Sequence, residues 1–299
     1  FREKYLDNPE PIDWSQYIEA EDNNGNPIKF ENLSFGQDQV LNGEVSAKFV
    51  YTFNGEQTVE STEHTITFWY GIGTVEQWNA FAAKTGTTVE GFGGNYRLTA
   101  DIDFAGVDFM PAAGTPSETP NGTAGFSGTF DGCGYSMSNI LLASHNSAVF
   151  INLNGTGVIQ NLVINGIQAN GSGCAGLVIH NYGTVKDNLV INFYDISSWG
   201  AALVSNNTSF GTVSGCIADK VTFDNPTSNN FSLVKANIGK IENCLTVESN
   251  AANDVGAGKP DGTKTNVITI ESFTDDGGDS VFAYADGNYT YTQGESLTV

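Results

Sequence analysis

The stretch Gly157-Val158-Ile159-Gln160-Asn161-Leu162 recurs three more times in this chain with the same pattern. The other copies read Gly183-Thr184-Val185-Lys186-Asp187-Asn188, Gly211-Thr212-Val213-Ser214-Gly215-Cys216 and Gly239-Lys240-Ile241-Glu242-Asn243-Cys244. Their first glycines are 26, 28 and 28 residues apart. Short apolar runs that recur with a period in the twenties, separated by Gly and Asn, are typical of a solenoid. The sequence therefore predicts an all-β solenoid with one coil per copy.

Equivalent positions of the copies are expected to stack into columns along the solenoid. The second position after each glycine is β-branched in every copy and is predicted to point inward: Ile159, Val185, Val213 and Ile241. The other inward columns are expected to hold Phe150, Leu177, Leu203 and Leu233, and Leu162, Leu189, Cys216 and Cys244. Cys216 and Cys244 are interpreted as buried, reduced thiols. An Asn ladder is expected to stabilise the turns: Asn154, Asn181, Asn207 and Asn237.

The charge of the chain limits its partners. The 299 residues contain 34 acidic and 12 basic side chains, for a net charge of −22. Nucleic acid and anionic membrane surfaces are therefore unlikely partners, because both require clustered Lys and Arg. No apolar run approaches the roughly 20 residues that span a bilayer. Abundant Gly with few charged residues favours a β-rich extracellular protein.

Two further segments of the sequence have a resemblance to a known protein family. Tyr96–Phe104, then Phe126–Gly132 with Ile140-Leu141, resemble the entry coils of bacterial surface proteins with GLUG repeats. Gly176–Val185 is similar to a full GLUG motif, and the copies at 202–213 and 232–241 are degenerate. The resemblance implies a right-handed parallel β-helix on a secreted or cell-surface, adhesin-like protein. The second glycine of Gly-Leu-Val-Gly is missing in all copies, which is a departure from the family pattern.

The chain is expected to have three parts. Residues 1–72 form a small β module with strands at 29–35, 45–53 and 58–69 and an Asn54-Gly55 hairpin turn. Residues 73–250 form the solenoid, whose first end is capped by a short amphipathic helix over 74–84. Residues 251–299 are interpreted as a loop to residue 265, followed by strands that cap the other end, two of them joined by an Asp286-Gly287 turn.

The outward columns do not support catalysis. Enzymes on β-helices stack carboxylates across adjacent coils, as an acid–base pair or as calcium ligands beside a lysine or arginine base. The columns here read Gln160, Lys186, Ser214 and Glu242, and Asn161, Asp187, Gly215 and Asn243. Neither gathers two carboxylates in successive coils. His64, His145 and His180 are scattered, with no partner for a catalytic triad.

A binding surface is the remaining candidate. Tyr194 and Trp199 lie close together in sequence, with Tyr182 one turn away, and flat aromatic faces can stack against sugar rings. Asp195 and Asn206 are expected to supply hydrogen bonds to the sugar hydroxyls. The alternative interpretation is that these rings fill a bulge between coils.

A calcium site is considered in the segment Asp275-Asp276-Gly277-Gly278-Asp279. Its ligands would be Asp275, Asp276 and Asp279, but the closing Glu of an EF-hand is missing. A solvated loop is the alternative, and no other cofactor is expected.

The preferred hypothesis is a non-enzymatic surface protein that binds a polysaccharide, a glycoprotein or a host matrix protein. The alternatives are a polysaccharide lyase or glycosidase on the same fold, and a purely structural spacer.

Overall fold

The computed structural model describes residues 12–13, 34–35, 44–53, 57–67, 69–86, 92–114, 125–197, 199–258, 260–270, 272–274, 281–285, 288–292 and 296–298. The chain divides into two compact units, Phe1–Tyr70 and Gly71–Val299. In the first unit, β1 (Ile12–Asp13) pairs antiparallel with β2 (Ser34–Phe35). The predicted hairpin is confirmed as β3 (Glu44–Phe53) and β4 (Gln57–Thr67), which also pair antiparallel.

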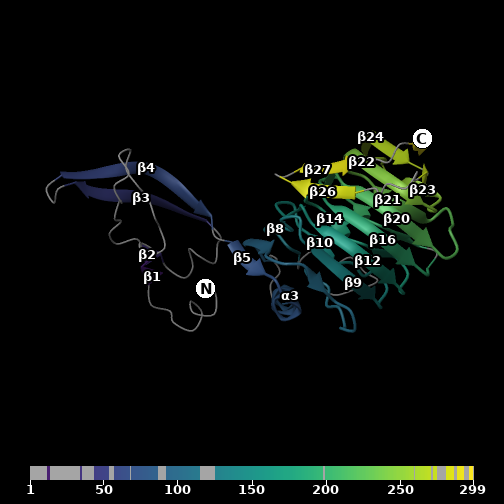
Figure 1. The fold of residues 1–299 in the computed structure, drawn as a ribbon, viewed down its shortest axis with the longest axis horizontal. Helices are drawn as coiled ribbons and strands as arrows, with labels where there is room; N and C mark the ends of the chain where they lie inside the picture. The colour runs from purple at the N-terminus through teal and green to yellow at the C-terminus, as the bar shows by residue number, and fades with distance from the viewer. Residues whose placement is uncertain are drawn as a thin grey trace. The chain divides into compact units, whose positions relative to one another are not determined.

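The second unit is a parallel β-solenoid of about seven turns, as predicted (Figure 1). Within the described residues, its larger sheet has 13 strands. They are β5 (Trp69–Ile72), β6 (Asn95–Leu98), β7 (Ile102–Asp103), β8 (Thr129–Asp131), β9 (Ser136–Leu142), β11 (Val158–Gln160), β12 (Val163–Ala169), β15 (Thr184–Lys186), β16 (Leu189–Asp195), β19 (Thr212–Ser214), β20 (Ile217–Phe223), β22 (Lys240–Ser249) and β24 (Thr263–Ile270). The coils from β11 to β20 each contribute two of these strands, separated by a bend, whereas β22 and β24 each run through the equivalent bend as one strand.

The other wall of the solenoid is a sheet of 7 described strands. They are β10 (Phe150–Leu153), β13 (Cys174–Ala175), β14 (Val178–Asn181), β17 (Gly200–Ala201), β18 (Val204–Asn207), β21 (Asn230–Asn237) and β23 (Asn253–Ala257). Strands of successive coils pair in parallel, for example β14 with β18 and β18 with β21. Residues one coil apart in sequence therefore become lateral neighbours, about 4.8 Å apart.

The observed register confirms the column of β-branched residues. Ile159 pairs with Val185, Val185 with Val213, and Val213 with Ile241, and all four side chains are buried. Their burial contributes roughly 1.5–3 kcal/mol per side chain to the free energy of folding. The polar column Gln160, Lys186, Ser214 and Glu242 is also in register.

Two of the predicted columns need correction by one residue. Phe150 pairs with Val178, whereas the sequence alignment placed it with Leu177. Leu189 pairs with Val163, so the residue level with Leu162 is the buried Asn188. Asn188 is tolerated inside because its Oδ1 accepts from the Leu162 N–H (3.1 Å) and its Nδ2 donates to the Ile159 carbonyl (3.0 Å). Cys216 and Cys244 are buried free thiols, as expected.

The bends of the larger sheet are made by two columns of residues with left-handed backbone. The first column lies between two strands in the earlier coils and within β22 and β24 in the last two. It contains Asn161 (φ 53°), Asp187 (55°), Gly215 (62°), Asn243 (54°) and Asn266 (52°). The second contains Asn139 (57°), Gly166 (85°), Asn192 (56°), Lys220 (53°) and Glu248 (46°). Asn and Gly adopt this conformation at low cost, whereas Lys and Glu do not. The Asn, Asp and Gly residues of the first column are therefore explained by the left-handed backbone that the bend requires.

The Asn ladder is confirmed for three of its four predicted members. Asn181 Nδ2 donates to Asn207 Oδ1, and Asn207 Nδ2 donates to Asn237 Oδ1, each at 2.8 Å. All three side chains are buried. The prediction for Asn154 is wrong, because Leu153 takes the position level with Asn181.

A short helix closes the first end of the solenoid, as predicted (Figure 1). Helix α3 (Val75–Ala82) starts after Thr74, whose hydroxyl accepts from the Gln77 N–H (3.2 Å), and continues into a 3₁₀ turn over Ala83–Gly86. Trp78 is fully buried, and its indole N–H donates to the Met110 carbonyl (2.9 Å). Its ring packs against five others: Phe81, Phe104, Phe109, Phe130 and Phe150.

The coils extend beyond residue 250, where the repeat pattern ended. β23 pairs with β21 and β24 with β22, both in parallel, so residues 253–270 form a further coil where the sequence suggested a loop. The chain then forms two antiparallel pairs: β25 (Ser272–Thr274) with β28 (Ser296–Thr298), and β26 (Val281–Ala285) with β27 (Asn288–Thr292).

Among the described residues, no helix has the length and apolarity needed to cross a membrane.

Candidate functional site

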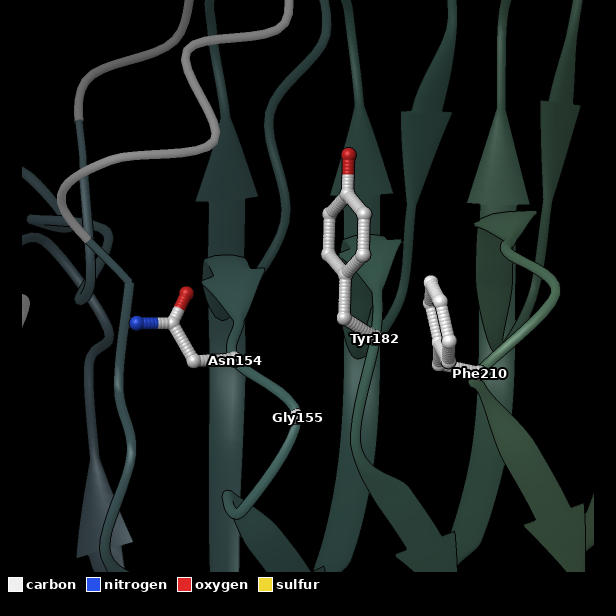
Figure 2. Close-up of a pocket in the computed structure, with 4 residues that line it drawn as sticks. All are labelled: Asn154, Gly155, Tyr182 and Phe210. Atoms are coloured by element: carbon white, nitrogen blue, oxygen red, sulfur yellow. The ribbon is translucent and has the colours of Figure 1, made fainter.

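A groove opens on the turns that connect the smaller sheet to the larger one. It has a volume of about 350 Å³ and is lined by Asn154, Gly155, Tyr182 and Phe210. Figure 2 shows Tyr182 and Phe210 projecting from neighbouring turns, with Asn154 on the other side of Tyr182. Three successive coils thus contribute to this surface, which we call the turn groove.

The Asn ladder holds the backbone of the turn groove. Asn181 directly precedes Tyr182, and its Oδ1 accepts from the Gly183 N–H (3.0 Å). The Tyr182 N–H donates to the Leu153 carbonyl of the previous coil (2.9 Å). Gly183 is required here, because an added Cβ would lie 2.3 Å from the Gly157 carbonyl oxygen. The rings are therefore mounted on a well-ordered stack of turns.

Phe210 is the most exposed large apolar side chain of the described residues, at 78%. It stands directly before Gly211, as Tyr182 stands directly before Gly183. The sequence analysis missed Phe210, although this shared position before the glycine was visible in the repeats. An exposed aromatic ring beside a second ring offers an apolar face to a ligand, with the Tyr182 hydroxyl available for a hydrogen bond.

A second surface is formed by Trp199 and Lys235. Trp199 lies just before β17 and is 48% exposed. The Nζ of Lys235, on β21 of the next coil, lies 4.9 Å from the centroid of the indole ring. This is a cation–π contact, worth about 0.5–2 kcal/mol depending on how far the pair is desolvated. We call Trp199 and Lys235 the Trp–Lys patch.

His180 and Asn206 lie near the Trp–Lys patch on the same sheet. They pair in register on β14 and β18, and Asn206 Nδ2 lies 3.3 Å from His180 Nδ1. Burial lowers the pKa of His180, and the charge of Lys235 lowers it further. Burial also lowers the pKa of Lys235 itself. Lys235 is thus partly buried and lies close enough to His180 for its charge to act on the imidazole.

The predicted binding residues are thus distributed over several places. Tyr182 lies in the turn groove, and Trp199 and Asn206 lie on the sheet around Lys235. Tyr194 is on β16 in the larger sheet, where its hydroxyl donates to Asp224. Tyr194 is therefore engaged with a neighbour of its own sheet.

Asp195 cannot act as an exposed hydrogen-bonding group, because its side chain is fully buried. Its Oδ1 accepts from the Ser197 N–H (2.7 Å), and its Oδ2 has no hydrogen-bond partner in the described part of the chain. A Cβ on Gly200 would lie 2.1 Å from this Oδ2, so only glycine fits opposite it. Burial raises the pKa of Asp195 to about 6. Its predicted role at an open surface is wrong.

The calcium candidates Asp275, Asp276 and Asp279 lie outside the described residues. Within the part that is described, no three His, Cys, Asp or Glu side chains are grouped as a metal site would require.

The polar column of the larger sheet begins before Gln160. Arg97, Asp131 and Gln160 precede Lys186 in this column, and Gln160 Nε2 donates to Asp131 Oδ2 (2.7 Å).

Comparisons with known proteins assign no family or activity to the chain. No family model matches the sequence, and no curated protein does. Among solved structures, the chain is similar to one from Bacteroides ovatus named "putative immunoglobulin A1 protease". That similarity has a TM-score of 0.49 and 14% sequence identity, and covers 77% of this chain and 80% of the other.

Proposed function

We propose that this chain is a non-catalytic, adhesin-like β-solenoid of a secreted or bacterial cell-surface protein, and that it binds glycan in the turn groove. Support for the location comes from the Gly-rich, acidic composition and from the resemblance to GLUG-repeat surface proteins. Support for binding comes from the geometry of the groove. A rigid stack of turns presents two aromatic rings, as expected for an apolar face against which a pyranose ring can pack.

The observation that carries this proposal is the 78% exposure of Phe210 beside Tyr182. Leaving a Phe ring in water forgoes roughly 1.5–3 kcal/mol of burial energy. The surrounding turn is held by hydrogen bonds, such as those from the Gly211 N–H to the Thr208 carbonyl (2.9 Å) and from the Thr208 N–H to the Asn181 carbonyl (3.0 Å). Because these hydrogen bonds hold the backbone of the turn, the Phe210 ring stays on the surface, where a ligand can contact it.

A glycan array followed by calorimetry tests the proposal. We expect the protein to bind at least one oligosaccharide, and Phe210→Ala to weaken binding by about 1–2 kcal/mol, or roughly 5–30-fold. Tyr135→Ala is the matched control, because Tyr135 is 39% exposed and lies between β8 and β9, away from the groove lining. Equal effects of both substitutions would contradict the proposal. Binding to a matrix protein instead of any glycan would contradict it too.

The alternative of a glycosidase has one specific pair of residues in its favour. Asp219 on β20 and Glu248 on β22 come from adjacent coils. Burial raises the pKa of Asp219 to about 6, Lys220 opposes this shift and the charge of Glu248 adds to it. A raised carboxyl pKa near a second carboxylate is typical of an acid–base pair. Release of reducing ends from a polysaccharide, abolished in Asp219→Asn, would favour hydrolysis over binding alone.

A further inference from the structure

Within the described residues, Lys235 combines an ammonium without a carboxylate partner and a neighbouring indole ring, in a chain with a net charge of −22. The Nζ of Lys240 lies 2.7 Å from Glu242 Oε2, whereas Lys235 has no carboxylate within ion-pair distance among the described residues. Lys235 is also partly buried. A partly desolvated ammonium without a counter-ion attracts an anion more strongly than one in bulk water, because the effective dielectric constant is lower.

The Trp199 indole gives this ammonium a neighbouring flat apolar face. The two residues come from consecutive coils, since Gly200 pairs with Asn230 at the start of β21. The ring is 48% exposed while its face also contacts Lys235 Nζ at 4.9 Å. A ligand that lies against the exposed part of the ring would therefore have a cation next to it.

Asn206 and His180 add neutral polar groups on the same sheet. Asn206 pairs with Ala236, the residue after Lys235, and therefore lies on the strand next to that of Lys235. Its Nδ2 and His180 Nδ1 lie 3.3 Å apart. The surroundings of Lys235 thus combine one cation, one indole face and amide and imidazole hydrogen-bonding groups.

We infer that the Trp–Lys patch is a subsite for a carboxylated sugar, with the sugar ring against Trp199 and the carboxylate facing Lys235. The inference extends the proposed function, because it names the class of glycan, but it depends on residues outside the turn groove. The net charge of −22 repels anions at long range, so selectivity for a carboxylate has to come from this local contact.

Paired ligands test the inference by calorimetry. The first pair is an oligogalacturonate and the same oligosaccharide with its carboxyl groups reduced to hydroxymethyl groups. The second pair is sialyllactose and lactose, so that the two arms distinguish uronic from sialic acids. We expect the wild-type protein to bind the acidic member of at least one pair about 10-fold or more tightly than the neutral member.

Substitutions then assign the preference to the patch. Lys235→Gln is expected to remove the preference for the acidic ligand while leaving affinity for the neutral one unchanged. Trp199→Ala is expected to weaken both at least 5-fold. Lys264→Gln on β24 is the control, since it removes the same charge from an exposed position of the last coil. Circular dichroism and a thermal melt verify that each variant is folded.

The outcomes separate this inference from the proposed function. A Lys264→Gln effect equal to that of Lys235→Gln, or no preference in either ligand pair, would overturn the inference. If Phe210→Ala alone weakens binding and the Lys235 variant behaves as wild type, the turn groove stands and the patch fails. If Lys235→Gln removes the acidic preference and Phe210→Ala has no effect, the patch stands and the groove fails.

Discussion

At the scale of single residues, the buried carboxylate of Asp195 makes stability depend on pH. Its pKa is raised by burial from 3.8 to about 6, so between these values the folded state binds more protons than the unfolded state. The contribution of Asp195 to the free energy of unfolding is therefore highest below about pH 4, falls as the pH rises through 6, and is constant at higher pH. The loss is about 2–3 kcal/mol, since each pKa unit corresponds to about 1.4 kcal/mol.

We predict that Asp195→Asn flattens this part of the stability profile. The amide keeps an oxygen that can accept from the Ser197 N–H but has no charge to bury. Urea denaturation between pH 4 and 7.5 measures the change. Asp261→Asn is the control, because Asp261 is exposed and its substitution changes the net charge equally. An unchanged slope in Asp195→Asn, or the same slope change in both variants, would contradict the assignment.

At the scale of elements, the Asn ladder connects the turns of three coils. We predict that Asn207→Ala lowers the free energy of unfolding by about 2–4 kcal/mol, because the substitution removes two buried hydrogen bonds and leaves Asn237 Oδ1 without its donor. Asn154→Ala is the comparison, since Asn154 lies outside the ladder register. Chemical denaturation of both variants measures the difference, and equal losses would contradict the ladder.

The column of left-handed residues in the larger sheet gives a second prediction at this scale. Glu248 has a φ of 46° at a position where Asn139, Gly166 and Asn192 stand in other coils. We expect Glu248→Asn to be about 0.5–1 kcal/mol more stable than Glu248→Gln, because both remove the charge but only Asn favours this backbone. Denaturation midpoints of the two variants provide the measurement. A Gln variant as stable as the Asn variant would refute the argument.

Much of the coil architecture could be predicted because the repeats encode it directly. The glycine spacing fixed the order of the coils, and the β-branched column Ile159, Val185, Val213 and Ile241 fixed their register. The last coil was missed, because β24 has Lys264 where the earlier copies have Ile or Val, and most of its residues are exposed. A terminal coil needs less apolar patterning, since only one neighbour covers it.

The candidate sites were less predictable, because they depend on which side chains of different coils meet. Tyr182 and Trp199 were recognised as aromatic, but the contact of Trp199 with Lys235 follows from pairing between β17 and β21. Asp195 was misplaced because its position at the end of β16 turns its side chain into the interior. Alternation with the buried Phe193 places Asp195 on the inward face, but the charge of its side chain favoured an outward position.

At the scale of the whole molecule, the solenoid is a continuous stack of paired strands on which successive coils display different side chains. The core is mainly apolar, with buried polar residues such as Asn188 and the Asn ladder, whereas the turns and the outer sheet faces carry the groove and the Trp–Lys patch. We propose that ligands are recognised on these stacked outer surfaces without bond cleavage. A structure of one oligosaccharide complex tests this proposal at the turn groove.

A crystal structure of the protein with its tightest oligosaccharide from the array tests that claim most directly. We predict an intact oligosaccharide with one sugar ring packed against Phe210 and Tyr182 in the turn groove. An oligosaccharide bound elsewhere with the groove empty, or a cleaved product beside Asp219 and Glu248, would contradict the account.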